Sequence, residues 1–151
     1  MKLAEALLER KHLQTEIEQL RHRLGRVAQV QEGDEPVEDP HELLKELELK
    51  IRQLEGTIVK INRTNTQAKL ADGRTLMEAI AERDMLMLRC IAWRELANAA
   101  RPERDRYNHR EIKFVPTVSS RAVQQEADRF AKQLRELDTQ IQAKNWEVEL
   151  L

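Results

Sequence analysis

Hydrophobic residues recur at alternating intervals of three and four along most of this chain, and this spacing is typical of one face of an α-helix. The pattern predicts four helices, over about residues 3–30, 41–67, 75–100 and 119–146. Helices of about 26 residues would each be roughly 40 Å long, because an α-helix rises about 1.5 Å per residue. Matching lengths and short connections favour antiparallel packing. We therefore expect an all-α fold of four long antiparallel amphipathic helices, as one bundle or as two paired helical hairpins, in a single helical domain of residues 1–151.

Cap and loop residues mark where the helices begin. Residues 31–40 include two prolines, one glycine and five acidic residues, which cannot continue a helix. We expect Asp39 to cap the second helix with Pro40 at its first position, where the missing N–H would have had no partner in any case. Thr75 and Glu78 are spaced as a capping box for the third helix.

Residues 101–118 form the longest stretch without helical spacing. Ile112, Phe114 and Val118 alternate with other residues, and a residue before a proline, such as Val115, is biased toward an extended backbone. The pattern predicts one extended strap that lies along the helices just before the last of them.

The second helix ends its hydrophobic stripe on an amide. Its apolar positions keep strict spacings of three and four: Leu44, Leu47, Ile51, Leu54, Ile58 and Ile61. They lead up to Asn65, where a polar side chain usually fixes register or partner number at some cost in stability. With neighbours on its helix and arginines from elsewhere, this amide could form a buried polar network or, between subunits, a site for a small anion. The candidate ligand-binding residues are Asn62, Arg63, Asn65, Arg83 and Arg110.

The third helix is apolar on every side over part of its length. Between Met85 and Trp93 its one polar side chain is Arg89. Because a helix that is apolar all round is buried all round, this stretch lies either at the centre of the fold or against another subunit. We predict that its second face joins copies of the chain into a homo-oligomer, through Met85, Leu88, Ile91 and Ala92.

Composition limits the compartments and partners. Lys and Arg number 26 against 27 Asp and Glu, so the net charge of -1 provides no overall attraction to nucleic acid or to an anionic membrane. The single cysteine, Cys90, excludes an internal disulfide and fits a reducing compartment. The sequence begins without a signal-like apolar region and has no apolar stretch long enough to span a bilayer. We expect a cytoplasmic protein without membrane contact.

The sequence contains no motif that specifies a reaction. It has no glycine-rich phosphate loop, nucleophile elbow or zinc-protease motif. Glu9 and His12 have the spacing of a metal-binding pair, but His12 falls off the apolar stripe, and Cys90 lies among apolar residues, where a thiol is unreactive. We therefore expect no catalytic residue, no metal and no cofactor; this disfavours an enzyme and leaves the question open. Basic residues late in the first helix and in the strap leave a nucleic-acid accessory role as an alternative.

Several fragments, in order along the chain, carry a resemblance. They are Val30-Gln31-Glu32-Gly33, Glu35-Pro36, Glu38-Asp39-Pro40, Ile61-Asn62-Arg63-Thr64-Asn65, Asp72-Gly73, Thr75-Leu76, Glu111-Ile112-Lys113-Phe114-Val115, Arg135-Glu136-Leu137-Asp138-Thr139, Ile141-Gln142 and Asn145-Trp146. Together they resemble a small bacterial family labelled septicolysin-like, over nearly the whole chain. The resemblance implies a helical fold and a bacterial origin, and it supplies no catalytic residues. The label implies a cholesterol-directed pore former, a role that we do not expect of a short helical chain.

Three hypotheses of function follow. The first is a bacterial cytoplasmic helical protein that associates with itself as a structural or interaction protein, with any other protein partner unknown. The second is an anion or small-ligand site between subunits, with a possible enzymatic role. The third is a nucleic-acid accessory protein.

Overall fold

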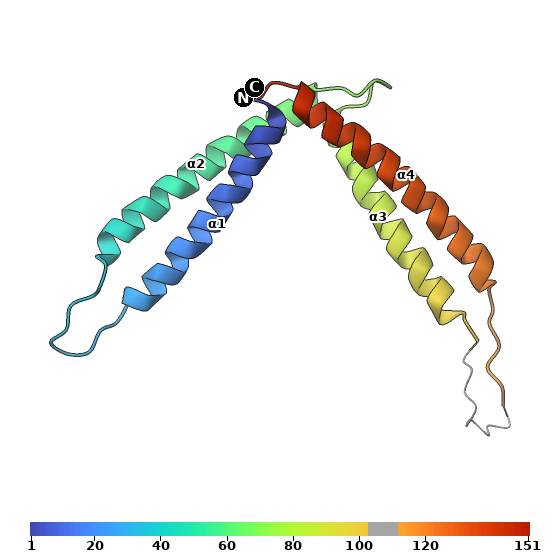
Figure 1. The fold of residues 1–151 in the computed structure, drawn as a ribbon, viewed down its shortest axis with the longest axis horizontal. Helices are drawn as coiled ribbons and strands as arrows, with labels where there is room; N and C mark the ends of the chain where they lie inside the picture. The colour runs from blue at the N-terminus through green and yellow to red at the C-terminus, as the bar shows by residue number, and fades with distance from the viewer. Residues whose placement is uncertain (103–111) are drawn as a thin grey trace. The chain divides into compact units, whose positions relative to one another are not determined.

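The computed structural model describes residues 1–102 and 112–151, and within them the chain is helical with no extended strand. The helices are α1 (Leu3–Val27), α2 (Pro40–Gln67), α3 (Leu76–Ala99) and α4 (Ser120–Glu147). Figure 1 shows α1 lying beside α2 and α3 beside α4. The all-α prediction with four long antiparallel helices is confirmed.

Helix ends follow the predicted cap chemistry. Asp39 Oδ1 accepts a hydrogen bond from His41 N at 2.9 Å, with Pro40 as the first residue of α2. Such a side-chain acceptor satisfies an N–H that has no partner within the helix. Ser119 caps α4 in the same way, accepting from Ala122 N at 3.2 Å. α3 begins at Leu76, which places Thr75 at the predicted cap position.

Contacts divide the chain into two compact units, Met1–Leu76 with Gln142–Leu151, and Met77–Ile141. We call them the first and the second unit. Each is built around one helical hairpin of the predicted kind. That all 151 residues unfold as a single domain stays a prediction.

The first unit is held by a small apolar core and by ion pairs between α1 and α2. Leu20, Val27 and Leu43 form a buried cluster. Arg23, near the end of α1, hydrogen-bonds Glu38 just before α2, whereas Glu16, earlier on α1, lies 2.9 Å from Lys50 further along α2, so the two helices run in opposite directions. The hairpin is therefore antiparallel.

The two ends of the chain meet within this unit. Leu3 N donates to Val148 O and Leu150 N donates to Met1 O, both at 2.9 Å, which makes a short antiparallel bridge. Lys2 Nζ lies 2.6 Å from Glu149 Oε1. The Lys2 side chain and the N-terminal amine of Met1 both pair with Glu149 and lower the pKa of its carboxyl, and Lys2 is the larger cause. We call this the terminal bridge.

A tight turn joins α2 to α3. Leu70 N donates to Arg74 O at 2.8 Å and Leu76 N donates to Ala68 O at 2.9 Å. Gly73 has a φ of 91°, a conformation that favours glycine. Asp72 hydrogen-bonds the Arg74 backbone and guanidinium, and these bonds lower the pKa of its carboxyl.

The second unit is an antiparallel pair packed mainly through apolar groups. Successive contacts run in opposite directions along α3 and α4: Ser120 Oγ donates to Ala97 O at 2.7 Å, and Arg83 Nη1 lies 3.5 Å from Asp138 Oδ1. The rings of Trp93 and Phe130 meet edge to face, with centroids 5.3 Å apart.

Two sequence expectations differ from the structure. On α2 the buried positions include Leu43 and Thr64, whereas Leu44 is exposed and Asn65 is half-buried, so the buried stripe is turned by about one residue near both ends. The described part of the strap, 112–118, is non-helical as predicted, but its apolar side chains are exposed rather than packed along the helices, with Phe114 86% exposed.

Candidate functional site

One face of α3 is buried against α4. Leu86, Cys90 and Ala97 are buried, and Cys90 Sγ lies 4.0 Å from Ala127 O. Trp93 Nε1 donates to Glu126 Oε2 at 2.6 Å at the margin of this contact. The α3 residues Leu86, Cys90, Trp93 and Ala97 follow one another at spacings of four, three and four, so they share one side of the helix. The packing of α3 on α4 uses this side.

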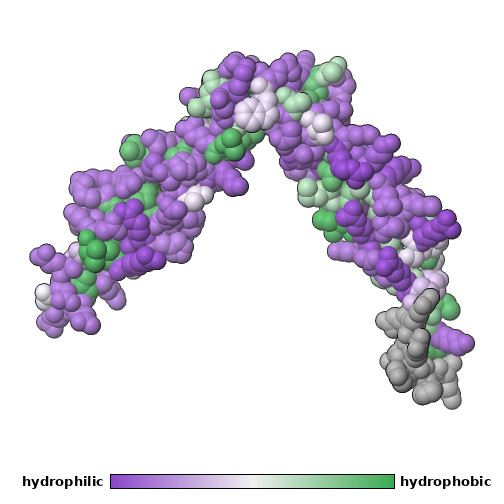
Figure 2. Space-filling model, viewed as in Figure 1, coloured by the Kyte–Doolittle hydropathy of each residue, from purple (hydrophilic) through white to green (hydrophobic). Residues whose placement is uncertain are grey.

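The opposite side of α3 is exposed although most of it is apolar. We call it the outer face of α3 and define it by seven exposed positions, Met77, Ala81, Asp84, Leu88, Ala92, Glu95 and Ala99, with the exposed Met85 and Ile91 at its edges. Leu88 is 58% exposed, whereas Leu86, two residues away, is 4% exposed. Figure 2 shows hydrophobic residues at the surface of the α3–α4 hairpin among hydrophilic ones. All four predicted interface residues, Met85, Leu88, Ile91 and Ala92, are exposed.

The predicted ligand-binding residues do not all belong to one unit. Asn62 and Arg63 are exposed and Asn65 is half-buried, all on α2 in the first unit. Arg83 belongs to the second unit, and Arg110 lies outside the described residues. A joint site made by these five residues stays a prediction.

Arg83 already has carboxylate partners on its own hairpin. Its Nη2 lies 3.0 Å from Asp84 Oδ1, and its Nη1 lies 3.5 Å from Asp138 Oδ1. Two carboxylates near one guanidinium neutralise the charge that would attract an anion. Both carboxylates belong to the second unit, and whether Arg83 joins Asn65 in a polar network or in an anion site stays a prediction.

The buried polar residue of α2 is Thr64, which the sequence interpretation missed in favour of Asn65. Thr64 is fully buried, and its Oγ1 donates to Lys60 O at 2.9 Å and accepts from Leu151 N at 3.0 Å. The first bond is one that a threonine can make within its own helix, so its hydroxyl needs no distant partner to be buried. Thr64 lies three residues and Asn65 four residues after Ile61, and both spacings keep a residue on the same side of a helix, so the spacing carried no signal that separates the two.

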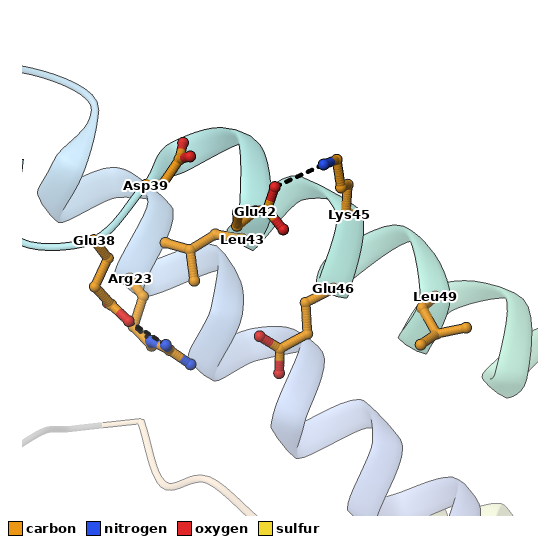
Figure 3. A pocket seen from close by; sticks show the side chains of 8 residues that line it. All are labelled: Arg23, Glu38, Asp39, Glu42, Leu43, Lys45, Glu46 and Leu49. Carbon is orange, nitrogen blue, oxygen red and sulfur yellow. Dashed lines mark hydrogen bonds and ion pairs between the residues drawn. The ribbon is translucent and has the colours of Figure 1, made fainter.

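A shallow surface hollow lies where α2 begins beside the end of α1. It has a volume of about 480 Å³, and Figure 3 shows charged side chains from both helices around it. Arg23 Nε donates to Glu38 Oε2 at 3.1 Å, and Lys45 Nζ lies 2.6 Å from Glu42 Oε1. Hydrogen bonding with Arg23 lowers the pKa of the Glu38 carboxyl and raises that of the arginine. These paired charges stabilise the loop end of the hairpin and leave no preorganised ligand position.

The described part of the chain holds neither a cluster of metal-binding side chains nor an exposed thiol. Residues 1–102 and 112–151 hold no group of three or more His, Cys, Asp or Glu side chains arranged to bind a metal. His12 is exposed and lies 3.6 Å from Glu16. Cys90 is a free, buried thiol. Among the described residues, no helix combines the length and hydrophobicity that crossing a bilayer requires.

Comparison with known proteins gives a family and a structural relative. A model for a family of unknown function, DUF6847, matches residues 10–150. The chain is also similar to a solved structure described as a functionally unknown conserved protein from Corynebacterium diphtheriae, with 41% sequence identity and a TM-score of 0.94 over 100% of this chain and 99% of the other. No match was found among curated proteins.

These findings overturn the resemblance to a septicolysin-like family, which was wrong. The matching family and the solved relative are both described as having unknown function, and neither description mentions septicolysin. Several of the fragments that carried the resemblance are caps and turns, such as Asp39-Pro40 and Asp72-Gly73. Such short signals recur wherever helices begin or end, so they do not identify a family.

Proposed function

This chain belongs to the family of unknown function DUF6847, and we propose that its function is to associate with a second copy of itself through the outer face of α3. The protein then acts as a structural or interaction protein, a homo-oligomer joined by helix pairing, and not as an enzyme. The observation that carries the proposal is that α3 is apolar on two sides, while its own hairpin covers one of them.

The contrast within α3 supports this proposal. Leu86 and Leu88 are the same residue type in the same helix, yet the first is buried and the second is more than half exposed. Five of the seven positions of the outer face are apolar, and an exposed apolar patch marks an interaction site more often than scattered single residues do. A second copy would remove this face from water.

We expect the two copies to associate with modest affinity. Burying a half-exposed Leu, Ile or Met contributes about 1 kcal/mol. Two copies supply eight such side chains, Met77, Met85, Leu88 and Ile91 of each. With the exposed alanines of the face they contribute roughly 10 kcal/mol before the cost of association. That cost is at least about 4 kcal/mol, so we expect a dissociation constant of roughly tens of micromolar.

Other features of the chain support a reducing compartment and disfavour the two alternative functions, an anion site and nucleic-acid binding. The one cysteine is buried as a free thiol, which fits a cytoplasmic protein. Arg83 is paired with carboxylates of its own unit, which disfavours an anion site there. The net charge of -1 disfavours broad binding to nucleic acid.

The experiment compares Leu88→Glu with Leu8→Glu by native mass spectrometry and light scattering. Leu8, on α1, is 61% exposed and therefore matches Leu88 in exposure but lies off the outer face. We expect Leu88→Glu to weaken dimerisation at least about tenfold, because it places a charge at the centre of an apolar contact, and Leu8→Glu to leave it unchanged. Equal association of both variants would contradict the proposal.

A further inference from the structure

We infer that the second unit binds the surface of an anionic lipid bilayer through the loop end of its hairpin. The binding residues are three exposed apolar side chains and four exposed basic ones, which we call the strap surface: Ile112, Phe114, Val115, Arg94, Arg101, Lys113 and Arg121. The inference is independent of the proposed function, because none of these residues belongs to the outer face of α3.

The apolar part of the strap surface lies within four consecutive residues. Ile112, Phe114 and Val115 are 81%, 86% and 76% exposed, whereas Leu88 on the outer face of α3 is 58% exposed. Figure 1 shows this segment beyond the ends of α3 and α4. Single exposed apolar residues are common on soluble proteins, but a group of them rimmed by polar residues marks a site of contact with a protein or a membrane.

The basic part of the strap surface has no carboxylate partner among the described residues. Arg83 and Lys132 of the second unit make ion pairs, whereas the four basic residues of the strap surface make none with a described residue. Residues 94–102 and 112–126 contain these four basic residues against two acidic ones, Glu95 and Glu126. The intervening stretch 103–111 contains three basic and three acidic residues, so it leaves this balance of charge unchanged.

The hairpin brings the two parts of the strap surface to the same end. Ser120 Oγ donates to Ala97 O at 2.7 Å, so the start of α4 lies beside the end of α3. Arg121 directly follows Ser120, and Arg101 comes two residues after the last residue of α3. Lys113 lies in the sequence between two of the apolar side chains. Basic side chains therefore flank the apolar ones at the loop end.

An anionic bilayer would satisfy both parts of the strap surface at once. Apolar side chains enter the boundary between headgroups and acyl chains, while nearby basic side chains are attracted to the charged headgroups. Nucleic acid fits less well, because Ile112 and Val115 carry no ring that could stack on a base. The expectation of no membrane contact followed from the net charge of the whole chain, which does not report a local patch. Surface binding of this kind requires no membrane-spanning helix.

The loop of the first hairpin is the matched contrast. It too exposes a large apolar side chain, Val37, which is 97% exposed. However, residues 31–40 contain five acidic residues and no basic one. An anionic lipid surface repels this loop, so Val37 is an exposed valine without a charge attraction beside it.

Co-flotation of the full chain with lipid vesicles tests the inference. The vesicles are phosphatidylcholine alone or phosphatidylcholine with about one-third phosphatidylserine, which carries the negative charge. One variant combines Ile112→Ser with Val115→Ser, a second combines Arg101→Gln with Lys113→Gln, and Val37→Ser is the control. All the replaced positions are exposed, and circular dichroism verifies that each variant is folded.

We expect the wild type to float with the anionic vesicles and to bind neutral ones at least about tenfold more weakly, because the basic residues contribute only on a charged surface. Each double variant should lower binding to anionic vesicles at least about tenfold, and Val37→Ser should bind like the wild type. Raising the salt from about 0.1 M to about 0.5 M should weaken binding, since it screens the attraction.

Three outcomes would overturn the inference. The first is a folded wild type that does not float with anionic vesicles. The second is wild-type binding by both double variants, which would mean that the strap surface is not the binding surface. The third is tighter binding to a labelled single-stranded DNA than to the anionic vesicles, which would make nucleic acid the partner of these basic residues.

Discussion

The two units of this protein hold their helices together by different means. The first unit joins α1 to α2 through the ion pair of Glu16 with Lys50, joins α1 to the loop before α2 through Arg23 and Glu38, and connects the chain ends in the terminal bridge. The second unit packs α3 on α4 with apolar and aromatic groups, and α3 then presents a further apolar face outward. Large apolar side chains stay exposed in both units, among them Leu44 and Val59 on α2 and Leu88 on α3. Our proposal is that a second copy covers those of α3.

The largest expected effect comes from truncating the buried core of either unit. Leu20→Ala in the first unit and Leu86→Ala in the second should each lower the free energy of unfolding by about 2–5 kcal/mol, because each leaves a cavity. If the chain is a single domain, each variant shifts one shared transition in urea. Two separate transitions, of which each variant moves a different one, would show that the units unfold independently. Leu8→Ala, at an exposed position, serves as the control.

A smaller effect is expected at the polar centre of the first unit. Thr64→Val keeps the shape of the side chain but removes the hydroxyl that accepts from Leu151 N and donates to Lys60 O. We expect a loss of about 1 kcal/mol in the free energy of unfolding, measured by urea denaturation. Thr66→Val is the control, since its exposed hydroxyl donates only to Arg63 O. Equal stability of the Thr64→Val variant and the wild type would argue that the chain end is not held by this residue.

The smallest expected effect is a loss in the free energy of unfolding at acidic pH, and we expect it to come from the first unit. In that unit the structure lowers the pKa of the carboxyl groups of Glu16, Glu38, Asp72 and Glu149. For Glu16 the main cause is its hydrogen bond with Lys50. Because its folded pKa lies below the ordinary value of 4.5, its stabilisation is complete above that pH and is lost as the pH falls through the folded pKa.

Urea unfolding at about pH 7 and about pH 3 measures this loss. Glu16→Gln should reduce the difference in unfolding free energy between the two pH values, and Lys50→Met should reduce it similarly, since each removes one partner of the same pair. An undiminished pH difference in both variants would mean that the pair contributes nothing to the first unit.

The sequence predicted the local structure well, because local signals determine it. Asp39 with Pro40, and Ser119, place helix starts through side chains that satisfy orphan N–H groups of the same helix. The exposed interface candidates on α3 were also predictable, since two apolar sides on one helix exceed what one neighbouring helix can cover.

The sequence did not predict which edge of the α2 stripe would face inward. Leu43 and Leu44 are adjacent, as are Thr64 and Asn65, and adjacent residues differ by about 100° around a helix. The contact with α1 and the chain end at Leu151 select Leu43 and Thr64, and neither contact is visible in the spacing along α2. The grouping of Asn62, Arg63, Asn65, Arg83 and Arg110 likewise depended on tertiary contacts that spacing cannot supply.

Sedimentation equilibrium of the wild-type protein, from about 5 to about 500 μM, tests the central claim most directly, since this range brackets the expected dissociation constant. If a second copy covers the outer face of α3, the average mass should rise from that of one 17.7 kDa chain toward that of two as the concentration increases. A mass that stays at one chain throughout would contradict the claim that α3 is completed by a second copy.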